Sequence, residues 1–201
     1  MATAYHGSAV LFSKFDLSHM MEGDGKIKFG CGIYVTDNYT TAAHYAYNKH
    51  RPQNKDFYVY TVEIPDRTPD NCLSLLKTVP VAESIVKRTE EKLGEPVPAE
   101  AKVEGIPFRK YLANRLTGNI TKVAKMTDKA TVEGEIAAAE FLRGIGVELI
   151  EWPVDWKKPQ AKKNMAVLED AKVHILRVEK VDLDPVKHQL IEGSQRPVSS
   201  I

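Results

Sequence analysis

Residues 29–47 read Phe-Gly-Cys-Gly-Ile-Tyr-Val-Thr-Asp-Asn-Tyr-Thr-Thr-Ala-Ala-His-Tyr-Ala-Tyr, and this stretch predicts the local architecture around it. Its two glycines allow a tight turn or the close approach of another group, because glycine has no Cβ atom. Residues 33–35 are β-prone, and either Asp37 or Asn38 can cap a helix over the alanine-rich residues that follow. The stretch therefore predicts a turn, a strand and a capped helix, in this order.

Two tyrosines of this stretch fall on different predicted elements. Tyr34 lies on the strand, and Tyr45 lies on the helix eleven residues later. Aromatic side chains that converge from a strand and the next helix can enclose a flat ring. They can equally be core residues, as many aromatic side chains are. This stretch alone leaves the two interpretations equal.

The composition is typical of one soluble globular domain. The chain has 201 residues, of which 43% are hydrophobic and 27% are charged. This length suffices for a proper hydrophobic core. The formal net charge is +1, so no global field recruits nucleic acid or a membrane, although a local basic patch remains compatible with it.

Cysteine usage and the N-terminal residues bear on compartment and metal content. Cys31 and Cys72 match neither a metal-ligand spacing nor a disulfide framework, so we expect no bound metal and a reducing environment. The N-terminal residues show no signal peptide, and no run of residues is long and apolar enough to span a membrane. We therefore expect a cytoplasmic monomer, in the producing cell or a host, without membrane contact.

The first predicted strand, residues 4–12, contains an unusual interruption at His6, Gly7 and Ser8. Glycine weakens a strand and often marks a place where a ligand meets the backbone. His6 taken alone is more often a structural histidine than a functional one. A second strand is predicted for residues 57–64, where β-branched and aromatic residues alternate.

The rest of the chain predicts a helical region followed by further strands. We expect helices over residues 80–93, 108–116 and 128–144, with a linker over 94–105. Gly94 ends the first helix, Gly118 the second, and Gly144 with Gly146 the third. Strands follow over residues 147–152, 164–168 and 173–178. Residues 1–185 would form one domain with a helical insertion at about 80–145, and 186–201 an irregular, partly disordered tail. Five basic residues of the insertion are expected to form a solvated charged face: Arg109, Lys110, Arg115, Lys122 and Lys125.

Four sequence pieces occur in an order that resembles a known enzyme family. They are Tyr-His-Gly-Ser at 5–8, Gly-Cys-Gly-Ile-Tyr at 30–34, Ala-Ala-His-Tyr at 42–45 and the strand at 57–64. This series resembles the NAD-dependent ADP-ribosyltransferases of the diphtheria-toxin and poly(ADP-ribose) polymerase branch, above all the polyvalent-protein domains of bacteria and phages. Residues 70–75, 137–152 and 164–169 extend the resemblance more loosely. It implies an α+β fold, a split β-sandwich with a helical insertion between the strand groups.

The resemblance also implies roles for five residues around NAD+. His6 would donate a hydrogen bond to a hydroxyl of the adenine-side ribose, and the backbone of Gly7 would pair with the nicotinamide carboxamide. Ser8 would support the same loop. Tyr34 and Tyr45 would enclose the nicotinamide ring, and stacking on electron-rich rings suits a pyridinium cation.

The catalytic acid is where the sequence departs from the polymerase-type pattern. Those members carry a glutamate where this chain has Asn164, which can hydrogen-bond a ribose hydroxyl but cannot offset developing positive charge. Cleavage of an N-glycosidic bond passes through an oxocarbenium-like state, so a carboxylate near the ribose should matter. Asp155 on a loop and Glu169 beyond the strand are the candidates, with a slight preference for Asp155. Glu148 and Glu151 are interpreted as ordinary strand carboxylates.

The expected function is mono-ADP-ribosyl transfer from NAD+ to a macromolecular acceptor, protein or nucleic acid, with release of nicotinamide. Loss of the polymerase glutamate argues for single transfer, and the small size suits a toxin or phage effector. NAD+ hydrolysis and an inert NAD-binding or interaction module of the same fold remain alternatives. A plain α+β interaction domain would require the motif order to be coincidence. Trp156, on a lysine-rich loop, is either an acceptor contact or a core residue, with equal weight.

Overall fold

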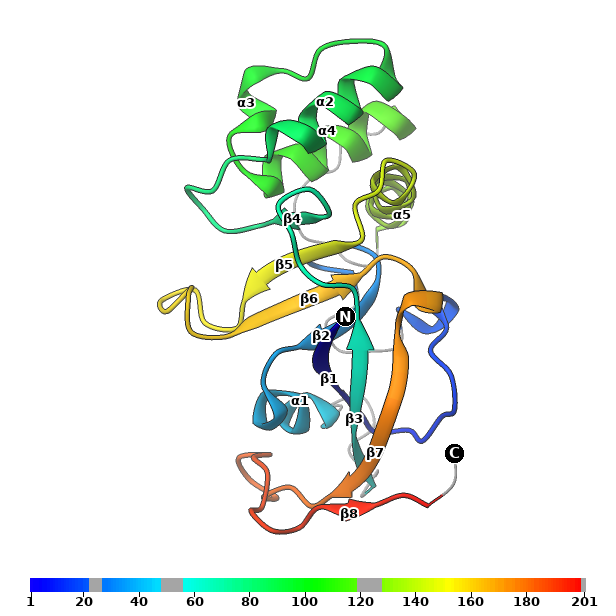
Figure 1. The fold of residues 1–201 in the computed structure, drawn as a ribbon, viewed down its shortest axis with the longest axis vertical. Helices are drawn as coiled ribbons and strands as arrows, with labels where there is room; N and C mark the ends of the chain where they lie inside the picture. The colour runs from blue at the N-terminus through cyan, green and yellow to red at the C-terminus, as the bar shows by residue number, and fades with distance from the viewer. Residues whose placement is uncertain (22–26, 48–55, 119–127, 200–201) are drawn as a thin grey trace.

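The computed structural model describes residues 1–21, 27–47, 56–118 and 128–199. Over these residues the chain combines one eight-stranded sheet with five α-helices (Figure 1), which confirms the expected α+β class. The order of strands across the sheet is β4-β5-β6-β2-β1-β3-β7-β8. Neighbouring strands are antiparallel except for β4 and β5, which run parallel.

The predicted strands occur in the predicted order, but the first ends at Ser8 and not at residue 12, and β8 was not predicted. Their bounds are β1 Ala2–Ser8, β2 Ile33–Thr36, β3 Phe57–Ile64, β4 Cys72–Ser74, β5 Leu149–Pro153, β6 Lys163–Val167, β7 His174–Val181 and β8 Arg196–Pro197. The helices are α1 Tyr39–Ala46, α2 Glu83–Leu93, α3 Ala99–Lys102, α4 Gly105–Thr117 and α5 Lys129–Arg143. Two short 3₁₀ turns, Leu17–His19 and Asp170–Lys172, complete the described elements.

Local sequence signals account for the helix ends. The Asn38 side chain accepts a hydrogen bond from the Thr41 backbone N–H at 3.0 Å and so caps α1. Gly94 and Gly118 end α2 and α4 in the left-handed conformation, with φ of 71° and 70°. The three predicted insertion helices are thereby confirmed. The linker expected between the first two was wrong in part, because it contains α3.

The sheet is joined narrowly at its centre. Strands β1 and β2 share one residue pair, Tyr5 with Thr36, whereas β1 pairs with β3 along its whole length. The strands on the two sides of this narrow join run at a steep angle to one another in Figure 1. Buried side chains from both sides nevertheless meet in one cluster, which includes Ala4 and Tyr60 from one side and Val35 and Met165 from the other.

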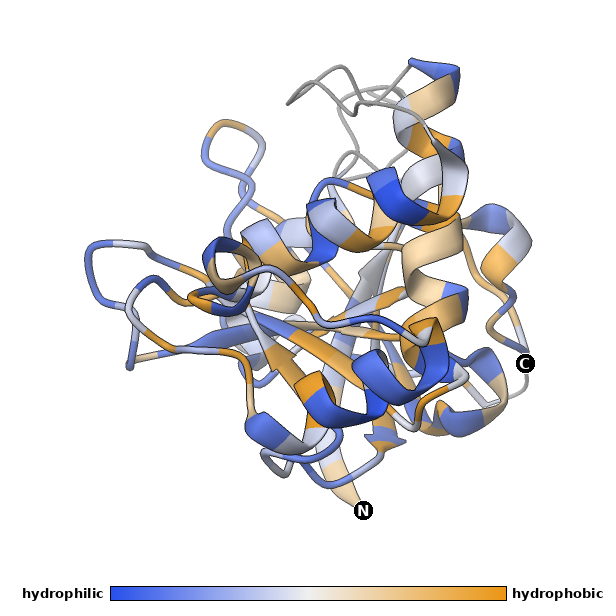
Figure 2. Cartoon of the chain, turned by 90° about the horizontal axis from the view of Figure 1, so that it is seen from above, coloured by the Kyte–Doolittle hydropathy of each residue, from blue (hydrophilic) through white to orange (hydrophobic). Residues whose placement is uncertain are grey.

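The helices cover the sheet in two places. Helices α2–α5 lie between β4 and β5 in the chain and gather at one end of the molecule (Figure 1). Their buried residues, among them Phe108, Leu112 and Leu142, pack in one cluster with Ile150 and Trp152 of β5. Helix α1 packs against β1, β2 and β3. Figure 2 shows hydrophobic residues gathered along the central strands and polar residues on the outer turns of the helices.

One charged residue of the insertion departs from its predicted place. Arg109 is 5% exposed and lies beside Glu135, so it does not belong to a solvated face. Lys110 and Arg115 are more accessible, and Lys122 and Lys125 lie outside the described residues. The spacing of Arg109 along α4 places it on the turn of the helix that faces the core, with Phe108 and Leu112.

The segment after Pro185, expected to be an irregular tail, consists mainly of turns and the short strand β8, which pairs with β7. Arg196 of β8 forms two hydrogen bonds with Asp182, at 2.9 and 2.6 Å. Within the described residues, no helix has the length and apolar character needed to cross a membrane.

Candidate functional site

The strand register places three of the predicted site residues on one face of the sheet. Thr36 is the partner of Tyr5 on β1 and of Asn164 on β6. Because side chains alternate along a strand, Gly7 shares the face of Tyr5, and Tyr34 shares the face of Thr36. Gly7, Tyr34 and Asn164 therefore lie on the side of the sheet that faces α1, close to the narrow join between β1 and β2.

Gly7 is where the backbone of α1 meets β1. A Cβ atom at this position would lie 1.8 Å from the carbonyl oxygen of Ala42 and 2.7 Å from the nitrogen of Ala46. Real Cβ atoms essentially never approach other atoms so closely. The sequence suggested that glycine leaves room for a ligand, and the structure supplies another reason, which is the packing of a helix directly on the strand.

His6 points to the opposite face from Gly7, into the core between the two sides of the sheet. Its ring contacts those of Phe12, Phe15 and Tyr60 at centroid distances of 5.1–6.0 Å. Its Nδ1 lies 2.7 Å from the Tyr34 carbonyl oxygen, so Nδ1 carries the proton and donates across the join. Burial lowers the pKa of His6 from its ordinary value of 6.5, which leaves the ring neutral and its Nε2 an acceptor.

Tyr34 is fixed by the turn that precedes its strand. Its hydroxyl accepts a hydrogen bond from the Phe29 backbone N–H and donates one to the Gly30 carbonyl oxygen, both at 2.9 Å. Its ring meets Trp152 edge to face at 4.9 Å. Burial raises the pKa of the Tyr34 hydroxyl, so the group stays protonated and remains a donor. The predicted strand position is confirmed, and the side chain is held in one orientation.

Tyr45 and Asn164 meet although they are 119 residues apart in the sequence. The Asn164 side-chain nitrogen donates to the Tyr45 hydroxyl at 3.2 Å. Asn164 is 5% exposed, and its side-chain oxygen is buried with no hydrogen-bond partner among the described residues. A buried acceptor without a partner costs free energy, and such atoms are rare outside sites that receive a ligand or water. Tyr45 is 48% exposed, so this pair lies at the surface edge of the face described above.

Neither of the predicted acidic residues, Asp155 and Glu169, forms a hydrogen bond with the Asn164 side chain. Asp155 is exposed, and its carboxylate accepts a hydrogen bond from the Lys157 backbone N–H within the hairpin loop. Glu169 follows the far end of β6 and lies 3.6 Å from Lys172. Glu169 is five residues beyond Asn164 along the strand direction, a span of roughly 16 Å at about 3.3 Å per residue. Ser8 faces away from α1, and its hydroxyl accepts a hydrogen bond from the Val10 N–H.

The two strand carboxylates expected to be ordinary have salt-bridge partners. Glu148 pairs with Lys172 at 2.6 Å, and Glu151 pairs with Arg67. Glu151 is the partner of Met165 in the sheet, so it lies on the opposite face from Asn164.

A cleft beside Tyr45 contains residues that the sequence did not single out. Its volume is about 710 Å³. It lies between α1 and the C-terminal segment, and the residues around it include Tyr39, His44, Tyr45, Val154, Glu192 and Gln195. Glu192 is thus a carboxylate on the same cleft as Tyr45, contributed by the segment expected to be an irregular tail. No motif marked it, because the contact depends on how that segment folds back on α1.

A buried ion pair lies beneath the Tyr34 turn. Arg109 Nε of α4 and Glu135 Oε2 of α5 are 2.8 Å apart, and each side chain is 6% exposed. Arg109 also donates to the Lys28 carbonyl oxygen at 3.1 Å, just before the turn that bonds the Tyr34 hydroxyl. Burial raises the pKa of Glu135, and the positive charge of Arg109 opposes that shift. The helical insertion therefore contacts the turn that holds Tyr34.

Among the described residues, no group of three or more histidine, cysteine, aspartate and glutamate side chains is arranged to hold a metal ion. No protein-family model matches the chain, and no curated protein sequence is significantly similar to it.

Proposed function

We propose that this chain cleaves the bond between nicotinamide and ribose in NAD+ and transfers the ADP-ribosyl group to a macromolecule. In this reaction the C1′–N bond breaks and its electron pair leaves with neutral nicotinamide. A nucleophilic atom of the acceptor then bonds to C1′ and loses a proton. The proposed fold is the split β-sandwich of the ADP-ribosyltransferases, for which the narrow join between β1 and β2 is the supporting feature.

The observation that carries the proposal is the meeting of Tyr45 with Asn164 on the face shared by Gly7 and Tyr34. Gly7, Tyr34 and Tyr45 come from three pieces of the series that resembles the family, and Asn164 comes from a segment that extends the resemblance more loosely. The partnerless Asn164 oxygen supports a ligand that brings a hydroxyl or amide donor, since a buried acceptor gains a hydrogen bond when such a donor arrives. A ribose hydroxyl and the nicotinamide carboxamide both supply one.

The protonation of His6 modifies the role that the resemblance implies for it. With Nδ1–H bonded to the Tyr34 carbonyl, Nε2 of the neutral ring is an acceptor. Because the His6 ring lies in the core on the opposite face from Gly7, its contribution to the proposed site is to hold the Tyr34 carbonyl, in place of the ribose contact expected from the resemblance. The Tyr34 carbonyl thereby links the histidine on one side of the sheet join to the tyrosine on the other.

A second candidate is NAD+ binding without cleavage. The observation in its favour is that Asp155 caps its own loop and Glu169 lies beyond the far end of β6. An oxocarbenium-like state without a nearby carboxylate would lack electrostatic stabilisation. Glu192, on the cleft beside Tyr45, is the carboxylate that transfer would most readily recruit.

Nicotinamide release from NAD+ by the purified protein, followed by liquid chromatography, tests the proposal. We expect the wild type to release nicotinamide and Asn164→Ala to release it at least ten-fold more slowly. Tyr45→Phe should also be slower, because it removes the hydroxyl that Asn164 bonds. Tyr47→Phe is the matched control, since it removes a hydroxyl near the same helix end from a ring that stacks on His188.

The acid candidates are compared in the same assay through Asp155→Asn, Glu169→Gln and Glu192→Gln. The variant that loses release while keeping NAD+ affinity identifies the carboxylate. Saturable NAD+ binding without release, with added cell lysate as a source of acceptor, would support the inert module. Absence of both binding and release would contradict the proposed NAD+ site.

A further inference from the structure

Three exposed lysines share the loop of the β5–β6 hairpin with an exposed tryptophan, and Lys28 lies over Phe29, whose ring is 6.4 Å from that tryptophan. The residues are Lys28, Trp156, Lys157, Lys158 and Lys162, and together they are called the basic hairpin surface. Trp156 is 42% exposed. Asp155 is the one carboxylate within the loop of residues 154–162, and its oxygen accepts a backbone hydrogen bond. The whole chain has a net charge of only +1, so this positive charge is concentrated locally.

Aromatic contacts connect this surface to the candidate NAD+ site. Trp156 lies 6.4 Å from Phe29, and Phe29 stacks on Trp152 at 4.7 Å. Trp152 in turn contacts Tyr34 and is the strand partner of Asn164. Lys28 Nζ lies 5.3 Å above the Phe29 ring. Two intervening rings, those of Phe29 and Trp152, therefore join Trp156 to Tyr34. Val154, in the same loop, lines the cleft beside Tyr45, so a polymer held on the basic hairpin surface could extend toward that cleft.

The chemistry of the surface fits a flexible polyanion with flat bases. Proteins that bind single strands combine lysine or arginine side chains along the phosphates with exposed aromatic rings on which bases stack. The hairpin presents both at one place. Its tip is a loop, so it offers neither a helix nor a paired ribbon to enter the groove of a duplex.

We propose that the basic hairpin surface binds single-stranded nucleic acid and that this nucleic acid is the acceptor of the transferred ADP-ribosyl group. The second half of the statement rests on the proposed function, and the first half does not. Binding is therefore measured without NAD+, and transfer is measured separately.

The binding experiment uses fluorescein-labelled 12-nucleotide single-stranded DNA and RNA, with a duplex of the same sequence as competitor, and follows fluorescence anisotropy. If four lysines contact phosphates, a rise in salt from 50 to 200 mM should weaken binding about 50-fold, since log K falls by roughly 0.7 per contact for each tenfold rise in salt. In a variant with Lys157, Lys158 and Lys162 all changed to alanine, the same rise should weaken binding only about three-fold.

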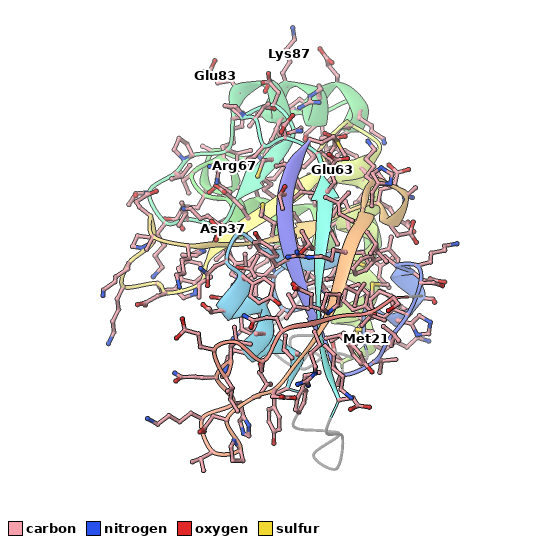
Figure 3. All side chains as sticks on the ribbon, turned by 60° about the horizontal axis from the view of Figure 1, so that its bottom comes forward. Met21, Asp37, Glu63, Arg67, Glu83 and Lys87 are labelled. Carbon is pink, nitrogen blue, oxygen red and sulfur yellow. The ribbon has the colours of Figure 1, made fainter. Side chains whose placement is uncertain are left out.

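The matched control removes the same number of charges from elements outside the hairpin, through Lys77→Ala, Lys87→Ala and Lys129→Ala. Lys87 projects outward from α2, far from the sheet (Figure 3). We expect this control to bind like the wild type. Trp156→Ala should weaken binding about 5- to 100-fold, and Trp156→Phe should restore most of it, because phenylalanine keeps a ring for stacking. Circular dichroism and thermal unfolding verify that each variant is folded.

Several results would overturn the inference. They are the absence of saturable single-strand binding at 50 mM salt, equal losses in the two lysine variants, an unaffected Trp156→Ala variant, and tighter binding of the duplex. Labelled ADP-ribose that appears on lysate proteins but not on the oligonucleotides would identify a protein acceptor and contradict the proposal. Nicotinamide release without oligonucleotide binding would contradict only the proposed role of the basic hairpin surface. Oligonucleotide binding without nicotinamide release would contradict only the proposed reaction.

Discussion

Replacing Gly7 with alanine tests whether helix packing determines the residue at this position. The new Cβ atom would lie 1.8 Å from the Ala42 carbonyl oxygen, and contacts under 3.0 Å essentially never occur. Helix α1 would have to retreat from β1 by more than 1 Å. The atoms that it strikes belong to the backbone, so no change of side-chain rotamer relieves the contact.

The expected cost follows from the packing of α1. Overpacking a core typically costs about 1–3 kcal/mol. Ala42, Ala43 and Ala46 of α1 are fully buried, so a shift of the helix disturbs the entire interface. We therefore expect Gly7→Ala to lower the free energy of unfolding by about 3 kcal/mol, at the upper end of that range. The same shift would move Tyr45 away from Asn164 and reduce nicotinamide release.

Urea denaturation at neutral pH, followed by circular dichroism, measures this loss. Gly118→Ala is the control, because Gly118 has a φ of 70° and no neighbouring atom within 4 Å of its added Cβ. That variant should lose only about 1–2 kcal/mol, from the left-handed backbone. Adding Ala42→Gly to Gly7→Ala should give no recovery, since the struck atom is the carbonyl oxygen.

One result would refute this reasoning. It is a free energy of unfolding of Gly7→Ala that lies within about 0.5 kcal/mol of the wild-type value, which is the size expected of a neutral surface change. In that case the packing of α1 on β1 would not require glycine at position 7. Loss of NAD+ affinity in such a stable variant would assign the requirement to the ligand.

Three further predictions concern residues around the site. Glu135→Leu leaves the buried Arg109 without its counter-charge and should lower the free energy of unfolding, measured in urea, by about 3–5 kcal/mol. The double variant that also carries Arg109→Met should recover most of this loss. A loss under about 1 kcal/mol in the single variant would contradict a buried ion pair. Because burial lowers the folded-state pKa of His6 below 6.5, the unfolded chain binds the proton first. The contribution of the neutral His6 ring to stability is therefore complete above pH 6.5 and is lost as the pH falls toward the folded-state pKa. The urea midpoint of the wild type should then fall more steeply between pH 7 and 5 than that of His6→Gln. Tyr34→Phe leaves two backbone groups of the turn without their partner and should cost about 1–3 kcal/mol in thermal unfolding, and an unchanged midpoint would mean that water replaces the hydroxyl.

Much of the local structure was predictable because its causes act over a few residues. A capping side chain at Asn38, left-handed glycines at 94 and 118, and β-prone runs at 33–35 and 57–64 each act on their own neighbourhood. The order of strands and insertion helices follows directly from these signals. The short helix α3 was missed, because Pro96 and Pro98 in the same stretch indicated a linker.

The candidate site was predictable only in part. Tyr34 on a strand and Tyr45 on the next helix follow from the sequence, and both positions are confirmed. The orientation of the Tyr34 ring, fixed by a turn and by Trp152, does not follow from it. The burial of Arg109 could not be predicted from the sequence either, because the periodicity of α4 does not indicate that α5 places Glu135 beside it.

The sequence by itself determined which segments become strands and helices, and in what order, since hydrophobic period, caps and glycines are local properties. Only the tertiary structure decided which side chains meet. The Asn164 side chain donates a hydrogen bond to Tyr45, 119 residues away in the sequence, and the backbone of α1 packs directly on Gly7. Such contacts depend on strand register and on how buried surfaces fit together. Those are set by the packing of the whole chain, so no single stretch specifies them.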